Sequence, residues 1–269
     1  MKKAFYGLMM FIVLLLFSGK GDMAAMQEKI KIFQLTYQSE NVSGMITING
    51  FAISEMKGKT STGTDVLNPW LIGDNEVKAE LKKADPSTPA NFILGVSELE
   101  RGSIVSTTDK GNLFSIEVKD KDFSKEGKAM VAKKFKTTLN FKQHLSDAGE
   151  AKMSDIIAYA QKYYALFAKK DAEGIIRESA VRLSDYSKSF GGVDMKTELL
   201  KYLKEELFKA KLNKLNPSKL RTVAVGPTKK IWHVYNGNDE LIKVKSSDGS
   251  TFEMAVYIGL LDGKLKVVR

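Results

Sequence analysis

The stretch MSDIIAYAQKYYALFAKKDAEGIIRESAVR, residues 153–182, decides the fold class of the C-terminal half of the chain. Its apolar residues recur at every third or fourth position, which is the pattern of a helix with one buried face. The polar run Lys169-Lys170-Asp171 interrupts this pattern, and an aspartate at such a place typically caps a following helix. We therefore expect two helices that meet at a bend, the first capped by Ser154 or Asp155 and the second by Asp171.

The segments after this stretch predict an α+β domain. A loop is expected at residues 184–193, and a third amphipathic helix at residues 194–212. Beyond Pro217, apolar and polar residues alternate, which is typical of strands. Strands separated by turn sequences are expected at residues 220–225, 229–235, 241–245, 251–261 and 264–268. Three helices followed by these strands predict a curved antiparallel sheet that packs on the helices.

This order of elements, together with YYALFAKKDAEGIIRESA at residues 163–180, resembles the nuclear transport factor 2-like (NTF2-like) superfamily. The resemblance implies a cone-shaped cavity between the sheet and the helices, in which some members place a catalytic Asp–His or Tyr–Asp pair. The residues that could line such a pocket here are Tyr159, Tyr163, Trp232, His233, Tyr235, Glu253 and Tyr257. Further titratable candidates are Tyr164, Asp185 and Tyr186.

Two of the expected strands supply most of these pocket candidates. Alternation places His233 and Tyr235 on one face of their strand and Trp232 on the other. Glu253 and Tyr257 are expected to share a face of the longest strand, residues 251–261. The pocket candidates Tyr159 and Tyr163 lie instead on the expected first helix. Tyrosines at helical spacing belong to a packed core more often than to a pocket.

The N-terminal half, residues 22–148, predicts about eight short strands and no long helix, which is typical of an antiparallel β-sandwich. Asn49-Gly50 predicts a hairpin turn, because both residues tolerate positive φ. Residues 57–64 are expected to form a loop, and Gly73 to Asn75 a turn. The strand after that turn is expected to bury Val77, Ala79 and Leu81. Further strands are expected at residues 91–99, 103–107, 113–118 and 133–142.

A second resemblance lies in this half. The segment LIGDNEVKAEL at residues 71–81, preceded by INGF at residues 48–51, is similar to sandwich modules that accompany carbohydrate-active enzymes. The resemblance implies a β-sandwich. Sugar binding would require exposed aromatic residues around Trp70, whereas a tryptophan that follows Pro69 in an apolar segment favours a place in the core.

Residues 1–21 have the pattern of a secretory signal peptide: Lys2 and Lys3, an apolar run over residues 4–17, and small residues at Gly19 and Gly21. The alternative is an uncleaved membrane anchor, although the run is shorter than the roughly 20 residues of a spanning helix. The chain contains no cysteine, so lipid attachment and disulfide bonds are excluded. We expect a periplasmic or secreted bacterial protein with a sandwich domain over residues 22–148 and an NTF2-like domain over residues 149–269.

The charge is distributed unevenly. The formal net charge is +10, of which three charges belong to lysines of the signal segment, and residues 22–148 carry 17 basic and 17 acidic residues. The remaining +7 therefore falls in the C-terminal domain and indicates an anionic partner. The candidate partner surface is the basic third helix and its continuation, with Lys201, Lys204 and Lys211, although exposed lysines are also typical of a solvated helix face.

The motifs argue against a recognisable enzyme. There is no glycine-rich phosphate loop, no HExxH sequence and no nucleophile elbow, and His144 and His233 are the only histidines. We therefore expect no catalytic residue, no metal and no cofactor, and an exported protein has no obvious nucleic-acid partner. Contact with a membrane is expected only through the signal segment, if that segment is retained.

The main hypothesis is a non-catalytic binding protein that recognises an envelope protein or a small ligand, for example an immunity-type protein. The alternatives are an isomerase- or hydrolase-type enzyme that uses the NTF2-like cavity and a carbohydrate-binding module.

Overall fold

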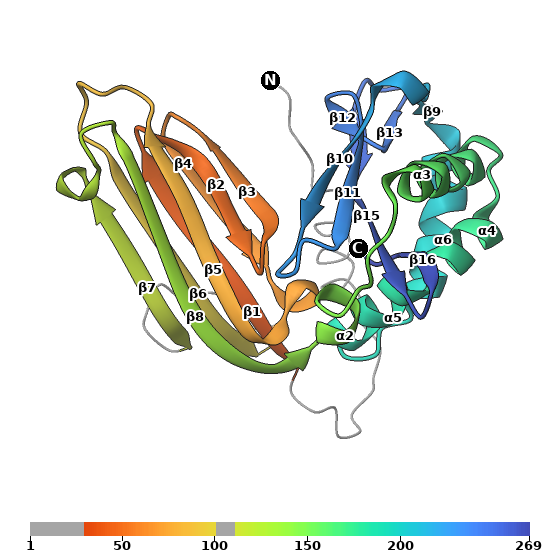
Figure 1. Ribbon diagram of the computed structural model, residues 1–269, viewed down its shortest axis with the longest axis horizontal. Helices are drawn as coiled ribbons and strands as arrows, with labels where there is room; N and C mark the ends of the chain where they lie inside the picture. Colours follow the sequence, from red (N-terminus) through yellow and green to blue (C-terminus); the bar gives the residue numbers. More distant parts are fainter. Residues whose placement is uncertain (1–29, 101–110) are drawn as a thin grey trace. The chain divides into compact units, whose positions relative to one another are not determined.

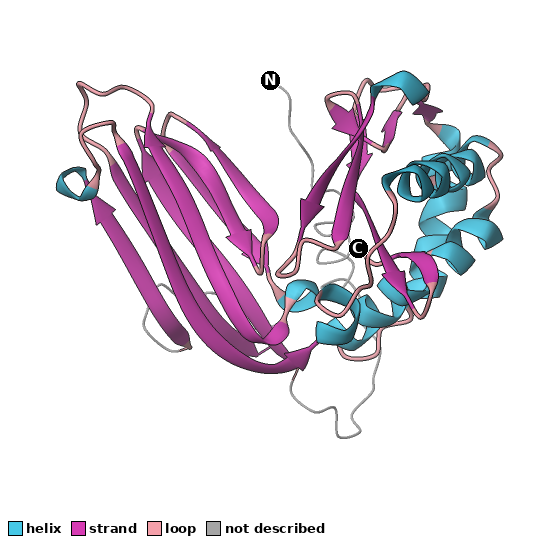
Figure 2. Ribbon diagram, in the orientation of Figure 1, coloured by secondary structure: helices cyan, strands magenta, loops and turns pink. Residues whose placement is uncertain are grey.

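The computed structural model describes residues 30–100 and 111–269, which divide into two compact units (Figure 1). The change of unit falls between Lys142 and Gln143. Both units contain antiparallel sheets and the second also contains the long helices (Figure 2), so the predicted α+β class is confirmed. The expected signal segment and the expected strand at residues 103–107 lie outside the described residues.

The N-terminal unit consists of two four-stranded antiparallel sheets. The first has the spatial order β4 (Ser61–Val66), β1 (Lys31–Glu40), β6 (Asn91–Glu100) and β7 (Asn112–Lys119). The second has the order β3 (Phe51–Lys57), β2 (Val42–Ile48), β5 (Ile72–Lys83) and β8 (Lys128–Asn140). Short 3-10 turns lie at η1 (Asn68–Trp70) and η2 (Asp120–Asp122). In the central strands of the two sheets, β1 and β6 in the first and β2 and β5 in the second, apolar side chains of alternate residues are buried, which is the expected two-residue period.

The turn and strand signals of the N-terminal half are largely confirmed. β2 and β3 form a hairpin whose turn residues, Asn49 and Gly50, have φ values of 51° and 79°. The side chains of Val77, Ala79 and Leu81 on β5 are buried as expected. Alternation of apolar residues and the preferences of turn residues were sufficient to predict these features, because both depend only on residues close together in the sequence.

Two local predictions in this half are wrong. Part of the expected loop at residues 57–64 belongs to the end strand β4, which pairs with β1 through its main chain and therefore needs no large apolar residues. The expected turn at Gly73 lies inside β5 as an irregularity in its pairing with β8. The side chain of Asn75 holds that irregularity, because its Oδ1 accepts a hydrogen bond from the Ile72 amide at 2.8 Å.

The helices of the C-terminal unit are α2 (Lys142–Leu145), α3 (Met153–Ala168), α4 (Ala172–Glu178), α5 (Ala180–Ser189) and α6 (Met195–Glu205), with 3-10 turns η3 (Leu207–Lys209) and η4 (Pro217–Lys219). The predicted bend after α3 is confirmed, and the Asp171 carboxylate accepts a hydrogen bond from the Gly174 amide at 2.9 Å. The cap predicted for the first helix is wrong, because the N-cap is Lys152 and both Ser154 and Asp155 lie inside the first turn.

The chain folds into more helices here than the sequence predicts. The expected loop at residues 184–193 is mostly α5, whose buried face includes the polar residues Asp185 and Ser189 and therefore lacks a continuous apolar pattern. The expected helix at residues 194–212 ends at Glu205. Its last residues form η3 and then β9 (Lys211–Leu212), because Lys211 and Leu212 pair with a distant strand.

The C-terminal strands form two sheets instead of one. The larger sheet has the order β10 (Leu220–Val225), β11 (Ile231–Asn236), β15 (Val256–Leu261) and β16 (Lys264–Val267), with β12 (Asp239–Glu240) paired to β11. The smaller sheet has the order β14 (Thr251–Met254), β13 (Ile242–Lys245) and β9. The single strand expected at residues 251–261 is therefore wrong: it is divided at Ala255 between the two sheets.

Candidate functional site

The pocket candidates on β11 and β15 converge on His233, which is only 5% exposed. Nε2 of His233 lies 2.7 Å from Oε2 of Glu240, and Nδ1 lies 2.7 Å from the hydroxyl oxygen of Tyr235. We call Arg221, His233, Tyr235, Glu240 and Tyr257 the His233 cluster.

Strand register brings the His233 cluster together. His233 and Tyr235 are two residues apart on β11 and so project from the same face of the sheet. Tyr257 is the partner of His233 on β15, while Arg221 on β10 and Glu240 on β12 are both partners of Tyr235. The side chains therefore meet on one face of the larger sheet.

The aromatic rings of the His233 cluster lie close to one another. The His233 ring centroid is 4.0 Å from that of Tyr235 and 4.2 Å from that of Tyr257. The Arg221 guanidinium lies over the Tyr235 ring, 4.1 Å from its centroid, and Nε of Arg221 donates to the Gly237 carbonyl oxygen at 2.8 Å. Such a cation–π contact favours a fixed orientation of both side chains.

The protonation states follow from the contacts. Burial and the nearby Glu240 carboxylate raise the pKa of Tyr235 to about 12, so its phenol is protonated at neutral pH. An ionised Glu240 can only accept, which places a proton on Nε2 of His233. When the imidazole is neutral, its Nδ1 accepts a hydrogen bond from the Tyr235 hydroxyl. Both ring nitrogens of His233 are thus used, and the arrangement is a hydrogen-bonded chain from Tyr235 to Glu240.

The remaining pocket candidates do not join the His233 cluster. Trp232 projects from the opposite face of β11. The Tyr159 hydroxyl donates to Glu178 Oε2 at 2.7 Å, and the Tyr163 hydroxyl lies 2.8 Å from Ser179 Oγ. Burial raises the pKa of both tyrosines. They are polar groups satisfied within the helical layer.

Glu253 is also separate from the cluster, which corrects the expectation that it shares a strand face with Tyr257. It lies on β14 in the smaller sheet, where its carboxylate is 2.5 Å from Nζ of Lys243. Lys243 also contacts Asp239 at 2.6 Å. Although partial burial acts to lower the pKa of Lys243, hydrogen bonds to these two carboxylates raise it overall.

Sequence reasoning missed Arg221 and Glu240. The signal for Glu240 was present, because the turn residues 236–239 return the chain and bring it opposite Tyr235. No comparable signal marks Arg221, since its position depends on the register of β10 with β11.

A second polar cluster joins two fully buried side chains, Asp185 and Arg269, to the partly buried His144. Asp185 accepts from Nη1 of Arg269 at 2.7 Å, and its carboxylate lies 2.9 Å from Nδ1 of His144. The side chains of Asp185 and Arg269 are both 0% exposed. Burial lowers the pKa of Arg269, and the charge of Asp185 opposes that effect. These contacts tie α2, α5 and the end of the chain together within the C-terminal unit.

A groove of about 520 Å³ lies on the surface of α4, α5 and α6. Its apolar lining includes Ile176, Leu183 and Met195, and its charged lining includes Glu173, Arg177, Asp194 and Lys196. This groove contains none of the pocket candidates. The described residues therefore place the His233 cluster and the groove at separate locations.

The partner-surface candidates Lys201, Lys204 and Lys211 are exposed. Within the described part of the chain none of them forms an ion pair. Lys211 is the register partner of Lys245, which is also exposed, so two like charges stand opposite each other on β9 and β13.

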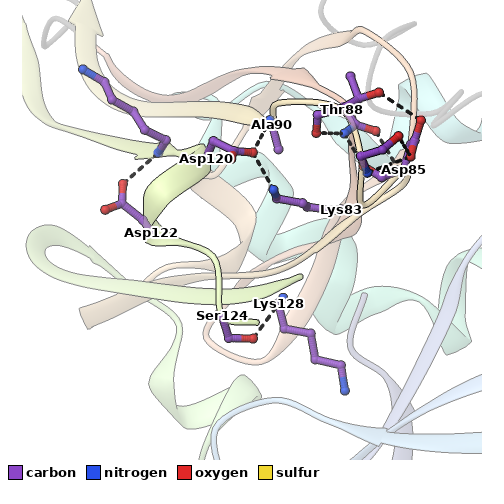
Figure 3. Close-up of polar contacts among 11 residues, drawn as sticks. Lys83, Asp85, Thr88, Ala90, Asp120, Asp122, Ser124 and Lys128 are labelled. Carbon is purple, nitrogen blue, oxygen red and sulfur yellow. Dashed lines mark hydrogen bonds and ion pairs between the residues drawn. The ribbon is translucent and has the colours of Figure 1, made fainter. Parts of the chain in front are cut away.

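Three aspartates in the loops of the N-terminal unit, Asp85, Asp120 and Asp122, form hydrogen bonds within that unit (Figure 3). Asp120 accepts from the Ala90 amide at 2.8 Å and from Lys83 Nζ at 2.6 Å, and these hydrogen bonds lower its pKa. Asp85 accepts from Ser87 and Thr88. Among residues 30–100 and 111–269, no group of His, Asp or Glu side chains has the geometry of a metal site.

Trp70 occupies the core, as expected. It is 8% exposed and packs against Phe51 with a centroid separation of 5.1 Å. The carbohydrate-module hypothesis required an exposed Trp70. Because Trp70 is buried, it is not in a position to contact a sugar.

The fold and the site define a two-unit α+β protein whose most conspicuous polar cluster is internally hydrogen-bonded. No protein-family model matches the chain, and neither a curated protein nor a solved structure is significantly similar to it. No helix in the described ranges is long and apolar enough to span a membrane.

Proposed function

We propose that this chain is an exported, periplasmic, non-catalytic protein that binds an acidic envelope protein, as an immunity-type protein would. In this proposal the two sheets of the N-terminal unit form a β-sandwich and the C-terminal unit is a variant of the NTF2-like fold. The antiparallel topology of both units supports that arrangement. The second small sheet and the division of residues 172–189 into α4 and α5 are departures from the expected pattern.

One observation carries the binding proposal: Lys201, Lys204 and Lys211 are exposed and have no ion-pair partner among the described residues. The titratable pocket candidates, by contrast, are engaged with neighbouring side chains. Exposed unpaired charges of one sign increase the rate of encounter with a surface of opposite charge.

A charge-reversal capture experiment tests this proposal. The protein is immobilised, incubated with envelope extract, and the captured proteins are identified by mass spectrometry at low and high salt. Lys201→Glu, Lys204→Glu and Lys211→Glu together should reduce capture of acidic proteins about tenfold and remove its salt dependence. The matched control reverses three exposed lysines of the N-terminal unit, Lys125, Lys133 and Lys134, which changes the net charge equally. Equal capture by the two triple variants would refute the proposal.

The Tyr235–His233–Glu240 chain favours a second candidate function, that of an acid–base enzyme of hydrolase or isomerase type. Such a chain could move a proton between the Tyr235 hydroxyl and the Glu240 carboxylate. An activated aryl ester is a suitable probe of hydrolysis. This candidate requires turnover that His233→Asn abolishes, and it fails if the unmodified protein does not accelerate hydrolysis.

A further inference from the structure

The strand β10 ends one side of the larger C-terminal sheet. It pairs with β11 through six residues, from Leu220 opposite Asn236 to Val225 opposite Ile231. No other described strand pairs with it. In an antiparallel strand, alternate residues direct their N–H and C=O groups to either side. The outer edge of β10 therefore presents main-chain donors and acceptors that another strand could use.

The sequence of β10 contains few of the residues that prevent an edge strand from pairing with a further strand. The six residues, LRTVAV, include no proline or glycine and only one charge. Val223 is 41% exposed, and Thr222 and Ala224 are half-buried. Exposed end strands usually carry charges, proline or a bulge that prevents further pairing. In β10, Arg221 is the only such charge, and it is held against Tyr235 and Gly237.

The chain segment that contains β10 carries only positive charges. Residues 207–238 include seven basic residues and no acidic residue. Three of these lysines lie at the ends of the strand: Lys219 before it, and Lys229 and Lys230 in the turn to β11. Lys230 contacts Glu150 at 3.8 Å, whereas Lys219 and Lys229 form no ion pair with a described residue. A segment that approaches this edge is therefore favoured if it is acidic.

We infer that the outer edge of β10 receives an extended acidic segment of the partner protein, which adds to the larger sheet as a further strand. This inference rests on the proposed function, because it specifies the partner's binding mode. Main-chain hydrogen bonds would supply affinity, and carboxylates near Lys219 and Lys229 would supply specificity. Residues 149–269 carry a net charge of +7, so repulsion opposes a second copy of this chain in the same place.

The test uses a defined probe, the acetylated and amidated peptide (Glu-Val)4, and hydrogen–deuterium exchange of the full chain. Binding should slow exchange at residues 220–225 several-fold and leave the opposite end strand, β16, unchanged. The same peptide with every backbone nitrogen methylated keeps its charges but cannot donate main-chain hydrogen bonds. The N-methylated peptide should bind at least about tenfold more weakly and should not slow exchange at residues 220–225. A (Lys-Val)4 peptide should not bind.

A pair of charge-reversal variants provides the matched control. Lys219→Glu with Lys229→Glu should weaken peptide binding about tenfold, whereas Lys264→Glu with Lys266→Glu, both within β16, should not. Equal binding of the N-methylated peptide, or protection that appears away from residues 220–225, would overturn strand addition.

That result would not refute the proposed function, because the capture experiment that tests the function depends on Lys201, Lys204 and Lys211. Conversely, the two triple variants could capture acidic proteins equally while the peptide still slows exchange at residues 220–225. That combination would refute only the proposed function.

Discussion

The hydroxyl oxygen of Tyr235 lies 2.7 Å from Nδ1 of His233, and the imidazole is held on its other side by Glu240 at the same distance. Two residues that are adjacent on one strand face are thus joined to a third that reaches them across a turn. Because His233 is almost completely buried, each of its ring nitrogens needs a partner from the protein.

Replacement of Tyr235 by phenylalanine should therefore destabilise the protein. The change removes the hydroxyl group and leaves Nδ1 of a buried imidazole without its partner, at a cost of about 1–3 kcal/mol in the free energy of unfolding. Urea denaturation measures this difference. Tyr37→Phe is the control, because no hydrogen bond of the Tyr37 hydroxyl to a described residue is observed, and it should cost less than about 0.5 kcal/mol. Equal costs would show that the contact with His233 contributes nothing.

The two aspartates near the ends of α3 should differ in their effect. Asp171 caps α4 through the Gly174 amide, so Asp171→Ala should lower the free energy of unfolding by about 1 kcal/mol. Asp155 lies inside the first turn of α3 and makes no capping hydrogen bond to the backbone. Asp155→Ala should therefore change stability by less than about 0.5 kcal/mol. Thermal unfolding of the two variants side by side checks the expectation, and a larger loss for Asp155→Ala would contradict it.

Asp65 should make the stability of the N-terminal unit dependent on pH. Burial raises the pKa of its carboxyl group above the ordinary value of 3.8, while a hydrogen bond from Ser54 acts in the opposite direction. The folded state therefore binds a proton at pH values where the unfolded chain has lost it. The stability that this group contributes is complete below pH 3.8 and is lost as the pH rises through the raised pKa.

Asp65→Asn tests that sign. The variant cannot ionise, so its stability relative to the unmodified protein should increase as the pH is raised from 3 to 7 and remain constant above the raised pKa. The free energy of unfolding, measured across this range, reports the difference. A difference that does not vary with pH would show that Asp65 titrates alike in the folded and unfolded states.

The ion pair between Asp185 and Arg269 should contribute far more to stability than the one between Glu253 and Lys243. Both side chains of the first pair are 0% exposed, whereas those of the second are 29% and 20% exposed. Asp185→Asn removes the carboxylate that pairs with a buried guanidinium and should cost about 3–5 kcal/mol. Glu253→Gln should cost no more than about 1 kcal/mol. Denaturation of both variants at low and high salt measures the contrast, and similar losses would contradict it.

The candidate site illustrates how far sequence patterns extend. Alternation on β11 correctly separates His233 and Tyr235 from Trp232, because successive side chains of a strand always project from opposite faces. The same reasoning failed for Glu253 and Tyr257, since it assumed one continuous strand. Whether a strand continues past Ala255 depends on which partners are available on each side, and those partners are β13, β11 and β16.

The sequence by itself determined the features that depend on neighbouring residues: the hairpin turn at Asn49-Gly50, the Asp171 cap, the buried face of α3 and the mixed α+β class. These follow from backbone sterics, local hydrogen bonds and periodic burial, all of which act within a few residues. Only the tertiary structure decided that residues 251–261 serve two sheets, that Lys211 joins β13, and that Arg221 and Glu240 meet Tyr235. Strand pairing joins residues far apart in the chain, and its register is selected by the packing of the whole unit.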